Sequence, residues 1–201
     1  MRIENGVIVG SNGKYEIGNP IARYLISRFD RAVLESIRES SPSSVLEVGC
    51  GEGHVTDLIL KSGVSRLLAT DISVSLIKEN SMRSNDPRVT FKVADLMSLS
   101  VEERYDLVVC CEVLEHVEDP DRALDILHAL DAREYVLSVP REPIWRILNI
   151  CRGAYLRDLG NSPGHIHHFS RRAFVKFVER RFVVQSIRSP VPWTVLRCRP
   201  K

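Results

Sequence analysis

The stretch VLEVGCGEGH, residues 45–54, decides the fold of this chain. A short hydrophobic run is followed by three glycines at alternate positions, with one acid, Glu47, just before them. The glycines are Gly49, Gly51 and Gly53. Because glycine has no Cβ, peptide N–H groups at such a turn can approach a ligand closely. Residues 45–48 are therefore predicted to form a buried strand, and the glycines to lead into a helix that ends near Lys61.

Short β-like runs and longer helical periods alternate along the rest of the chain, a pattern typical of an α/β fold with a mainly parallel sheet. Besides the first strand, we expect strands at 66–70, 89–94, 105–110, 134–139, 182–186 and 193–198. An amphipathic helix is predicted from about Pro20 to Ser40, and others after the capping residues Ser73, Asp119 and Ser170. The regular alternation lapses between residues 140 and 169.

Composition limits the class of protein. With 201 residues, 44% of them hydrophobic and 27% charged, we expect one globular domain over residues 1–201, with an N-terminal cap at 1–40. The formal net charge of +2 does not favour a nucleic-acid partner. Five cysteines show neither CxxC nor zinc spacing, so we expect free thiols and no metal. Neither a signal peptide nor a membrane-spanning run is evident, and we expect a cytoplasmic protein.

Four acids are predicted to follow successive strands at one edge of the sheet: Glu47, Asp71, Asp95 and Glu112. A carboxylate at the end of the second strand can accept both hydroxyls of a ribose. The dinucleotide fingerprint GxGxxG is incomplete, because its third glycine would fall on His54 if it started at Gly49 and on Thr56 if it started at Gly51. The chain also has no GxxxxGK[ST] loop, so a pyrophosphate or phosphate ligand fits poorly. The acids favour a cationic nucleoside, such as S-adenosylmethionine, unless they only cap helices.

The segments VLEVGCGEG, LLATDIS, VADLMSL and YDLVVCCEVLEHVEDP resemble, in order and spacing, the cofactor motifs of class I S-adenosylmethionine-dependent methyltransferases. The resemblance is greatest to the small-molecule branch that includes the ubiquinone-biosynthesis type, and it covers residues 45–139. It implies a Rossmann-like, doubly wound sheet of seven strands, the last antiparallel, with helices on both faces. It also implies S-adenosylmethionine as cofactor and S-adenosylhomocysteine as product.

The resemblance further implies where the cofactor lies. Glu47 and the three glycines would line its methionine portion, Asp71 would take the ribose hydroxyls, and Asp95 would accept from the adenine amino group. Ile72 and Leu96 would flank the adenine. Cys111 and Glu112 would border the reactive centre.

Candidates for the chemistry lie outside these motifs. His116 is a candidate general base, because it follows Glu112 by four residues and would face the same side if EVLEHV begins a helix. It is equally a candidate for holding that turn by a hydrogen bond. Tyr15 is a candidate acceptor contact or a packing residue.

The segment at 140–169 is predicted to be a substrate lid, with Trp145, His165 and His168 as candidate acceptor contacts. Its arginines and apolar residues at 143–157 suggest peripheral membrane contact, or else a helix packed on the sheet edge. The sequence thus favours transfer of a methyl group to a small molecule. The alternatives are a nucleic-acid or protein methyltransferase and a catalytically idle cofactor-binding module.

Overall fold

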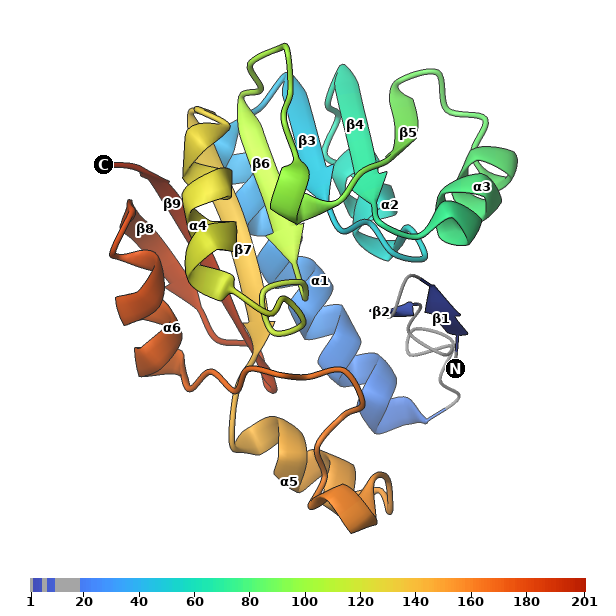
Figure 1. Ribbon diagram of the computed structural model, residues 1–201, viewed down its shortest axis with the longest axis vertical. Coiled ribbons are helices and arrows are strands. Elements are labelled where there is room, and N and C mark those ends of the chain that lie inside the picture. Colours follow the sequence, from blue (N-terminus) through green and yellow to red (C-terminus); the bar gives the residue numbers. More distant parts are fainter. Residues whose placement is uncertain (1, 5–6, 10–18) are drawn as a thin grey trace.

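The strands of the main sheet are β3 (Ser44–Val48), β4 (Arg66–Asp71), β5 (Val89–Val93), β6 (Leu107–Cys111), β7 (Glu134–Pro140), β8 (Phe182–Arg188) and β9 (Trp193–Pro200). In this computed structural model, which describes residues 2–4, 7–9 and 19–201, they lie in the order β5-β4-β3-β6-β7-β9-β8 (Figure 1). The first five of these are parallel, and β9 runs antiparallel to both β7 and β8. The predicted α/β fold, with seven strands and an antiparallel last one, is confirmed.

The helices are α1 (Pro20–Ser40), α2 (His54–Lys61), α3 (Val74–Arg83), α4 (Pro120–Ala129), α5 (Ile144–Cys151) and α6 (Arg171–Val178), with short 3-10 helices η1 (Leu96–Ser98) and η2 (Leu156–Asp158). The predicted caps are observed. Asn19, Ser73, Asp119 and Ser170 each accept a backbone N–H of the first turn through the side chain. Local capping chemistry therefore sets the starts of four helices.

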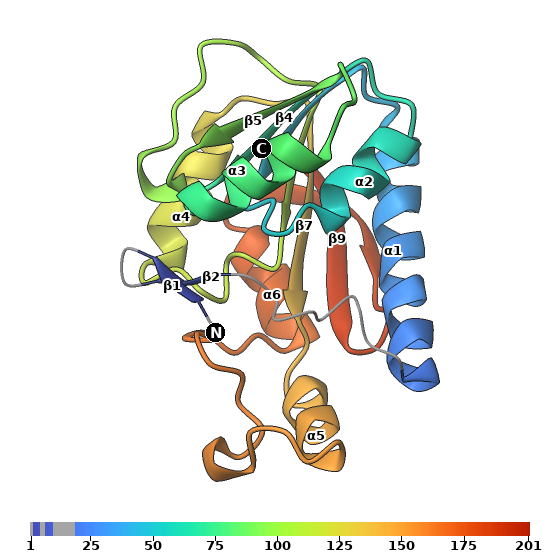
Figure 2. The same cartoon turned by 90° about the vertical axis from the view of Figure 1, so that its right-hand side faces the viewer.

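Two hydrophobic cores lie on the two faces of the sheet. On one face α1 and α2 pack against the sheet through residues such as Phe29, Ile37 and Ile59, all fully buried. On the other face α4 and α6 do so through Leu124, Leu127 and Phe174. Figure 2 shows these two layers on either side of the sheet. The resulting sandwich holds the carboxyl ends of the parallel strands along one edge.

A two-stranded antiparallel pair, β1 (Arg2–Glu4) and β2 (Val7–Val9), precedes this body and was not predicted. Within the part of the chain that the structure describes, every helix is too short or too polar to cross a bilayer.

Candidate functional site

The turn after β3 brings bare backbone to the carboxyl edge of the sheet. Its three glycines all have left-handed φ angles, 77° at Gly49, 52° at Gly51 and 83° at Gly53. The Gly49 N–H donates to the Thr70 carbonyl at 2.8 Å, which ties the turn to the neighbouring strand β4. A Cβ on Gly49 would lie 2.3 Å from Cγ2 of Val113, so only glycine fits without displacing that side chain.

Asp71, at the end of β4, holds this turn in place. Its carboxylate accepts the Gly51 N–H at 2.8 Å and the Ser73 N–H at 2.9 Å, and the residue is only 9% exposed. On the other side of the turn, the buried Asn80 amide of α3 donates to the Gly51 carbonyl at 2.8 Å. Sequence reasoning missed Asn80. The signal was a polar residue on the same helical face as the apolar Leu76.

Glu47 is the most strongly perturbed acid of the site. It is 2% exposed and accepts a hydrogen bond from the Thr56 hydroxyl at 2.6 Å. Burial raises the pKa of its carboxyl to about 8, the neighbouring Asp71 adds to this, and the Thr56 bond opposes it. Glu47 is therefore largely protonated at pH 7, and a cation bound beside it would favour ionisation.

The predicted adenine-side residues follow β4 and β5. Asp95 is exposed and accepts the Met97 N–H at 2.9 Å, so it caps η1. Leu96 is buried in a core cluster, whereas Ile72 is half-buried after β4. Asp95 and Ile72 thus follow adjacent strands at the same sheet edge as the glycine turn.

Glu112 is fixed directly after β6 by residues far away in the sequence. Its carboxylate accepts the indole N–H of Trp193 at 2.7 Å and the hydroxyl of Ser138 at 3.1 Å, and its φ angle is 61°. The preceding Cys111 is buried, and burial raises the pKa of its thiol well above the usual range. Cys111 therefore remains a neutral thiol.

The condition on which Glu112 and His116 would share a face, a helix beginning at EVLEHV, is not met. Residues 114–116 form a turn, and α4 begins only at Pro120, where Asp119 caps it. The left-handed Glu112 interrupts helical backbone. As a result Glu112 and His116 do not share a helix face. Glu112 bonds to β7 and β9, whereas His116 Nδ1 lies 2.8 Å from the carbonyl oxygen of Gly164.

The 140–169 segment returns to this turn and surrounds it with aromatic rings. The His165 ring lies 4.9 Å from the His116 ring, edge to face, and stacks 5.7 Å from Trp145. The backbone N–H groups of Ile166 and His167 both donate to the Glu115 carbonyl, at 2.9 and 3.0 Å. The structure therefore brings together His116, His165 and Trp145 of the predicted set.

Possible ligand atoms of Glu115, His116 and His165 all lie within 4.8 Å of one another. These three side chains could hold a metal ion, although the sequence had suggested none. Glu115, almost fully buried, was not among the predicted residues. The absence of a metal stays a prediction.

Two other candidates do not join this group. His168 is exposed, and its Nε2 lies 2.8 Å from the amide oxygen of Asn161. Tyr15 lies outside the described residues.

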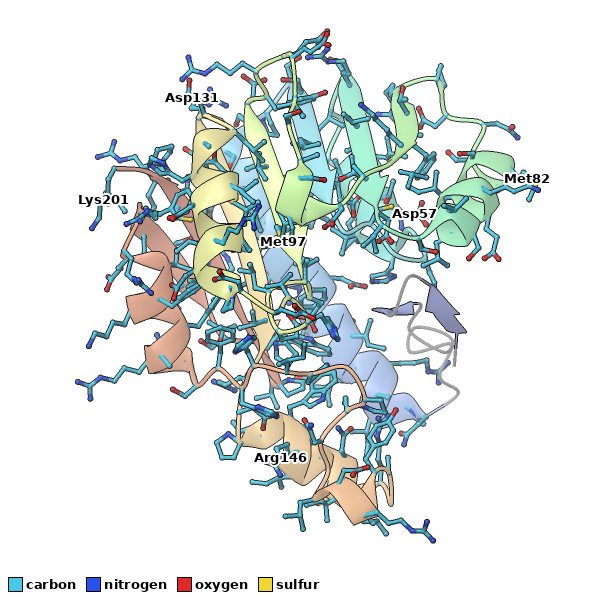
Figure 3. All side chains as sticks on the ribbon, in the orientation of Figure 1. Asp57, Met82, Met97, Asp131, Arg146 and Lys201 are labelled. Carbon is cyan, nitrogen blue, oxygen red and sulfur yellow. The ribbon has the colours of Figure 1, made fainter. Side chains whose placement is uncertain are left out.

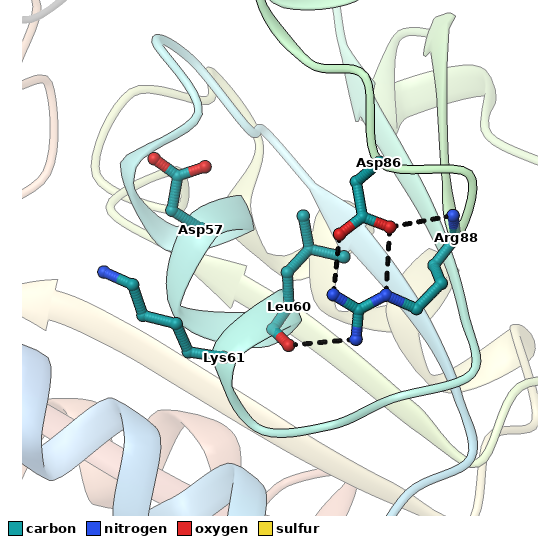
Figure 4. A pocket seen from close by; sticks show the side chains of 5 residues that line it. All are labelled: Asp57, Leu60, Lys61, Asp86 and Arg88. Carbon is teal, nitrogen blue, oxygen red and sulfur yellow. Dashed lines mark hydrogen bonds and ion pairs between the residues drawn. The ribbon is translucent and has the colours of Figure 1, made fainter.

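An open hollow of about 320 Å³ lies elsewhere, between α2 and the turn that precedes β5 (Figure 4). Its lining residues are Asp57, Leu60, Lys61, Asp86 and Arg88. Hydrogen bonds from Arg88 lower the pKa of Asp86 to about 2, and Arg88 also donates to the Leu60 carbonyl. Arg88, Asp86 and the Leu60 carbonyl thus bond to one another, and none of the predicted site residues lines this hollow.

Comparison with known proteins decides the family. The family described as "Methyltransferase domain" matches residues 21–181. The chain belongs to this methyltransferase family. The resemblance to class I S-adenosylmethionine-dependent methyltransferases is thereby confirmed.

A ubiquinone biosynthesis O-methyltransferase of Coxiella burnetii is 34% identical to this methyltransferase over 89 residues, which is 43% of this chain and 38% of that protein. One from Xanthomonas axonopodis is 28% identical over 148 residues, 70% of this chain and 60% of that protein. The chain thus spans only part of the length of these relatives. The N-methyltransferase NodS from Bradyrhizobium japonicum, solved with S-adenosyl-L-homocysteine, has the same fold, with a TM-score of 0.69 and 20% identity over 95% of this chain and 93% of that one.

The buried acid predicts a pH-dependent stability. Because the pKa of Glu47 is about 8 in the folded state and near 4 when unfolded, its contribution is fully present at acid pH and is lost as pH rises from about 4 to 8. In Glu47→Gln this loss disappears. The difference in unfolding free energy between wild type and variant should fall by a few kcal/mol over that range in urea titrations. If the unfolding free energies of wild type and Glu47→Gln changed equally with pH, the raised pKa of Glu47 would be contradicted.

The glycine turn predicts unequal costs for alanine. Gly51→Ala meets no atom within 4 Å and should lose only about 1 kcal/mol, for the left-handed backbone. Gly49→Ala adds the clash with Val113 and should lose roughly 1–3 kcal/mol more. Chemical denaturation measures both, with Gly63→Ala, also left-handed and unobstructed, as the matched control. Equal losses at Gly49 and Gly51 would contradict the close packing of this turn.

Proposed function

We propose that this protein transfers a methyl group from S-adenosylmethionine to a small-molecule acceptor. The carrying observation is the cradle formed by the left-handed glycine turn, the nearly buried Asp71 that holds it and the buried Glu47 at the end of β3. The acids suit a cofactor that carries positive charge on sulfur and nitrogen. The ubiquinone-biosynthesis relatives support a small-molecule acceptor.

The residues present fit this cofactor. A Cβ on Gly51 would meet no atom within 4 Å, so the space beside the backbone at this glycine is open to a ligand. Asp71 would accept hydrogen bonds from a ribose, and Glu47 would ionise to balance an ammonium group. When bound, S-adenosylmethionine supplies a methyl group on a sulfonium that is already a good leaving group.

His116 is placed to remove a proton from the acceptor. A carbonyl oxygen can only accept, so the 2.8 Å contact with Gly164 places the proton of a neutral ring on Nδ1. On this tautomer, Nε2 is the nitrogen that would take the acceptor proton. The Glu115 carboxylate, 3.8 Å from Nε2, would stabilise the resulting imidazolium. The His165 ring, which stacks on Trp145 and meets the His116 ring edge to face, would contact a planar or apolar acceptor beside His116.

Cofactor binding tests the cradle. Calorimetric titration should show binding of S-adenosylmethionine and S-adenosylhomocysteine and none of NADH. In Asp71→Asn the affinity for both should fall roughly ten- to hundredfold, because a charged hydrogen-bond acceptor is lost. Asp131→Asn, at an exposed left-handed position where asparagine is tolerated, is the control. Unchanged cofactor affinity in Asp71→Asn, or tight binding of NADH, would contradict the proposed S-adenosylmethionine site.

Turnover of an acceptor found by screening with labelled methyl donor tests the base. His116→Asn retains a side-chain donor for the Gly164 carbonyl but has no basic nitrogen. Its kcat should fall on the order of a hundredfold or more while cofactor affinity is kept, and the loss of rate at acid pH should vanish. Full turnover in this variant would leave His116 a structural residue.

A chelator distinguishes the base from a metal ligand. We expect turnover to survive dialysis against EDTA. If activity is lost and returns with one divalent ion, then Glu115, His116 and His165 hold a metal, and the proton transfer has to be assigned differently.

A further inference from the structure

The segment at 144–160 forms a lobe beyond the carboxyl ends of the parallel strands, apart from the sheet and its helices (Figures 1 and 2). We call it the α5–η2 lobe. It is a folded unit rather than a loose loop. The buried Asn149 amide donates to the Gly160 carbonyl at 2.8 Å, and Arg146 Nε donates to the Leu159 carbonyl at 3.1 Å. Trp145 anchors its base through an indole hydrogen bond to Ser162 at 2.8 Å.

The outer surface of this lobe is apolar. On α5, Trp145 and Asn149 face inward and are buried, whereas Ile147 is 52% exposed. Further large apolar side chains with high exposure follow in the lobe, namely Ile150 at 43%, Tyr155 at 37%, Leu156 at 57% and Leu159 at 68%. Tyr155 and Leu159 have left-handed φ angles of 53° and 49°, a costly backbone for such residues. Large apolar side chains are thus exposed at two positions where a small polar residue would have a lower conformational free energy.

The charge of the lobe is one-sided. Within 144–160 the charged side chains are three arginines and one aspartate: Arg146, Arg152, Arg157 and Asp158. Arg152 and Arg157 are exposed, and the guanidinium of Arg152 lies 6.0 Å from the centre of the Tyr155 ring. Exposed apolar side chains flanked by arginines are the composition of interfacial membrane segments.

We propose that the α5–η2 lobe docks onto an anionic lipid surface, with its leucines and isoleucines inserted among the acyl chains and Arg152 and Arg157 at the headgroups. An acidic protein could pair with the arginines of the lobe. It would not bury the exposed leucine and isoleucine side chains, which are spread over the lobe and which a lipid surface would cover together. The lobe is continuous with the acceptor side of the site, because residues 164–167 bond to Glu115 and His116. Docking does not depend on methyl transfer, so its test is separate from that of the proposed function.

Sedimentation with vesicles tests the docking directly. The full chain should bind vesicles of phosphatidylcholine with one-third phosphatidylglycerol, bind pure phosphatidylcholine weakly, and be released as salt is raised. Arg152→Gln with Arg157→Gln should weaken binding to the anionic vesicles about 25-fold, or roughly fivefold for each charge. Leu156→Ser with Leu159→Ser should weaken binding to both vesicle types by about tenfold or more.

Matched controls lie outside the lobe. Arg171→Gln with Arg172→Gln removes two exposed arginines from α6, and Met82→Ser removes an exposed apolar side chain from α3. Figure 3 shows Met82 well apart from Arg146 of the lobe. All variants are checked for native circular dichroism before the assay. Loss of binding in the controls equal to that in the lobe variants would overturn the assignment.

Cys151 gives a second readout. It is exposed in the lobe, whereas Cys50, Cys110, Cys111 and Cys198 are buried. A polarity-sensitive fluorophore attached to Cys151 should shift to the blue when anionic vesicles are added, and remain unshifted with poly-L-glutamate. A shift with poly-L-glutamate and none with vesicles would overturn the proposal in favour of an acidic polypeptide partner.

Discussion

One carboxylate holds the site together. Asp71 accepts an N–H group from the glycine turn after β3 and another from the start of α3, so a single side chain fixes the ends of two adjacent strands relative to each other. The Thr70 carbonyl and the Asn80 amide bind the same turn from two further directions. The backbone of Gly49 and Gly51 is therefore rigid before any ligand arrives. Preorganisation of this kind lowers the entropic cost of binding.

The same compactness creates the unusual state of Glu47. Its position at the end of a central strand, beneath the turn, removes it from water, and the nearby Asp71 discourages a second negative charge. The fold therefore stores a proton where a cationic ligand is expected. Binding of such a ligand would release that proton, and affinity would rise with pH toward the pKa of Glu47.

Local signals in the sequence were sufficient for most of the architecture. Helix α1 begins and ends where predicted, because the Asn19 cap and Pro20 act within one turn. The glycine turn and Asp71 were likewise predictable, because each follows a recognisable buried strand. The turn at EVLEHV was not, since its shape depends on Trp193, Ser138 and Gly164, which reach it from 26 to 81 residues away. Glu115 was missed for the same reason, because only the tertiary fold places it beside the site, whereas Asn80 gave a local signal, a polar residue on the apolar face of its helix.

The contacts between the lobe side and the turn after β6 have a mechanical consequence. The Gly164 carbonyl that sets the protonation pattern of His116 belongs to the chain that leads out of the α5–η2 lobe, and the next residues are bonded to Glu115. Movement of this chain segment would break the contact that places the ring proton of His116 on Nδ1. Under the proposed assignment of His116 as the base, proton transfer would therefore require this part of the chain to be in place.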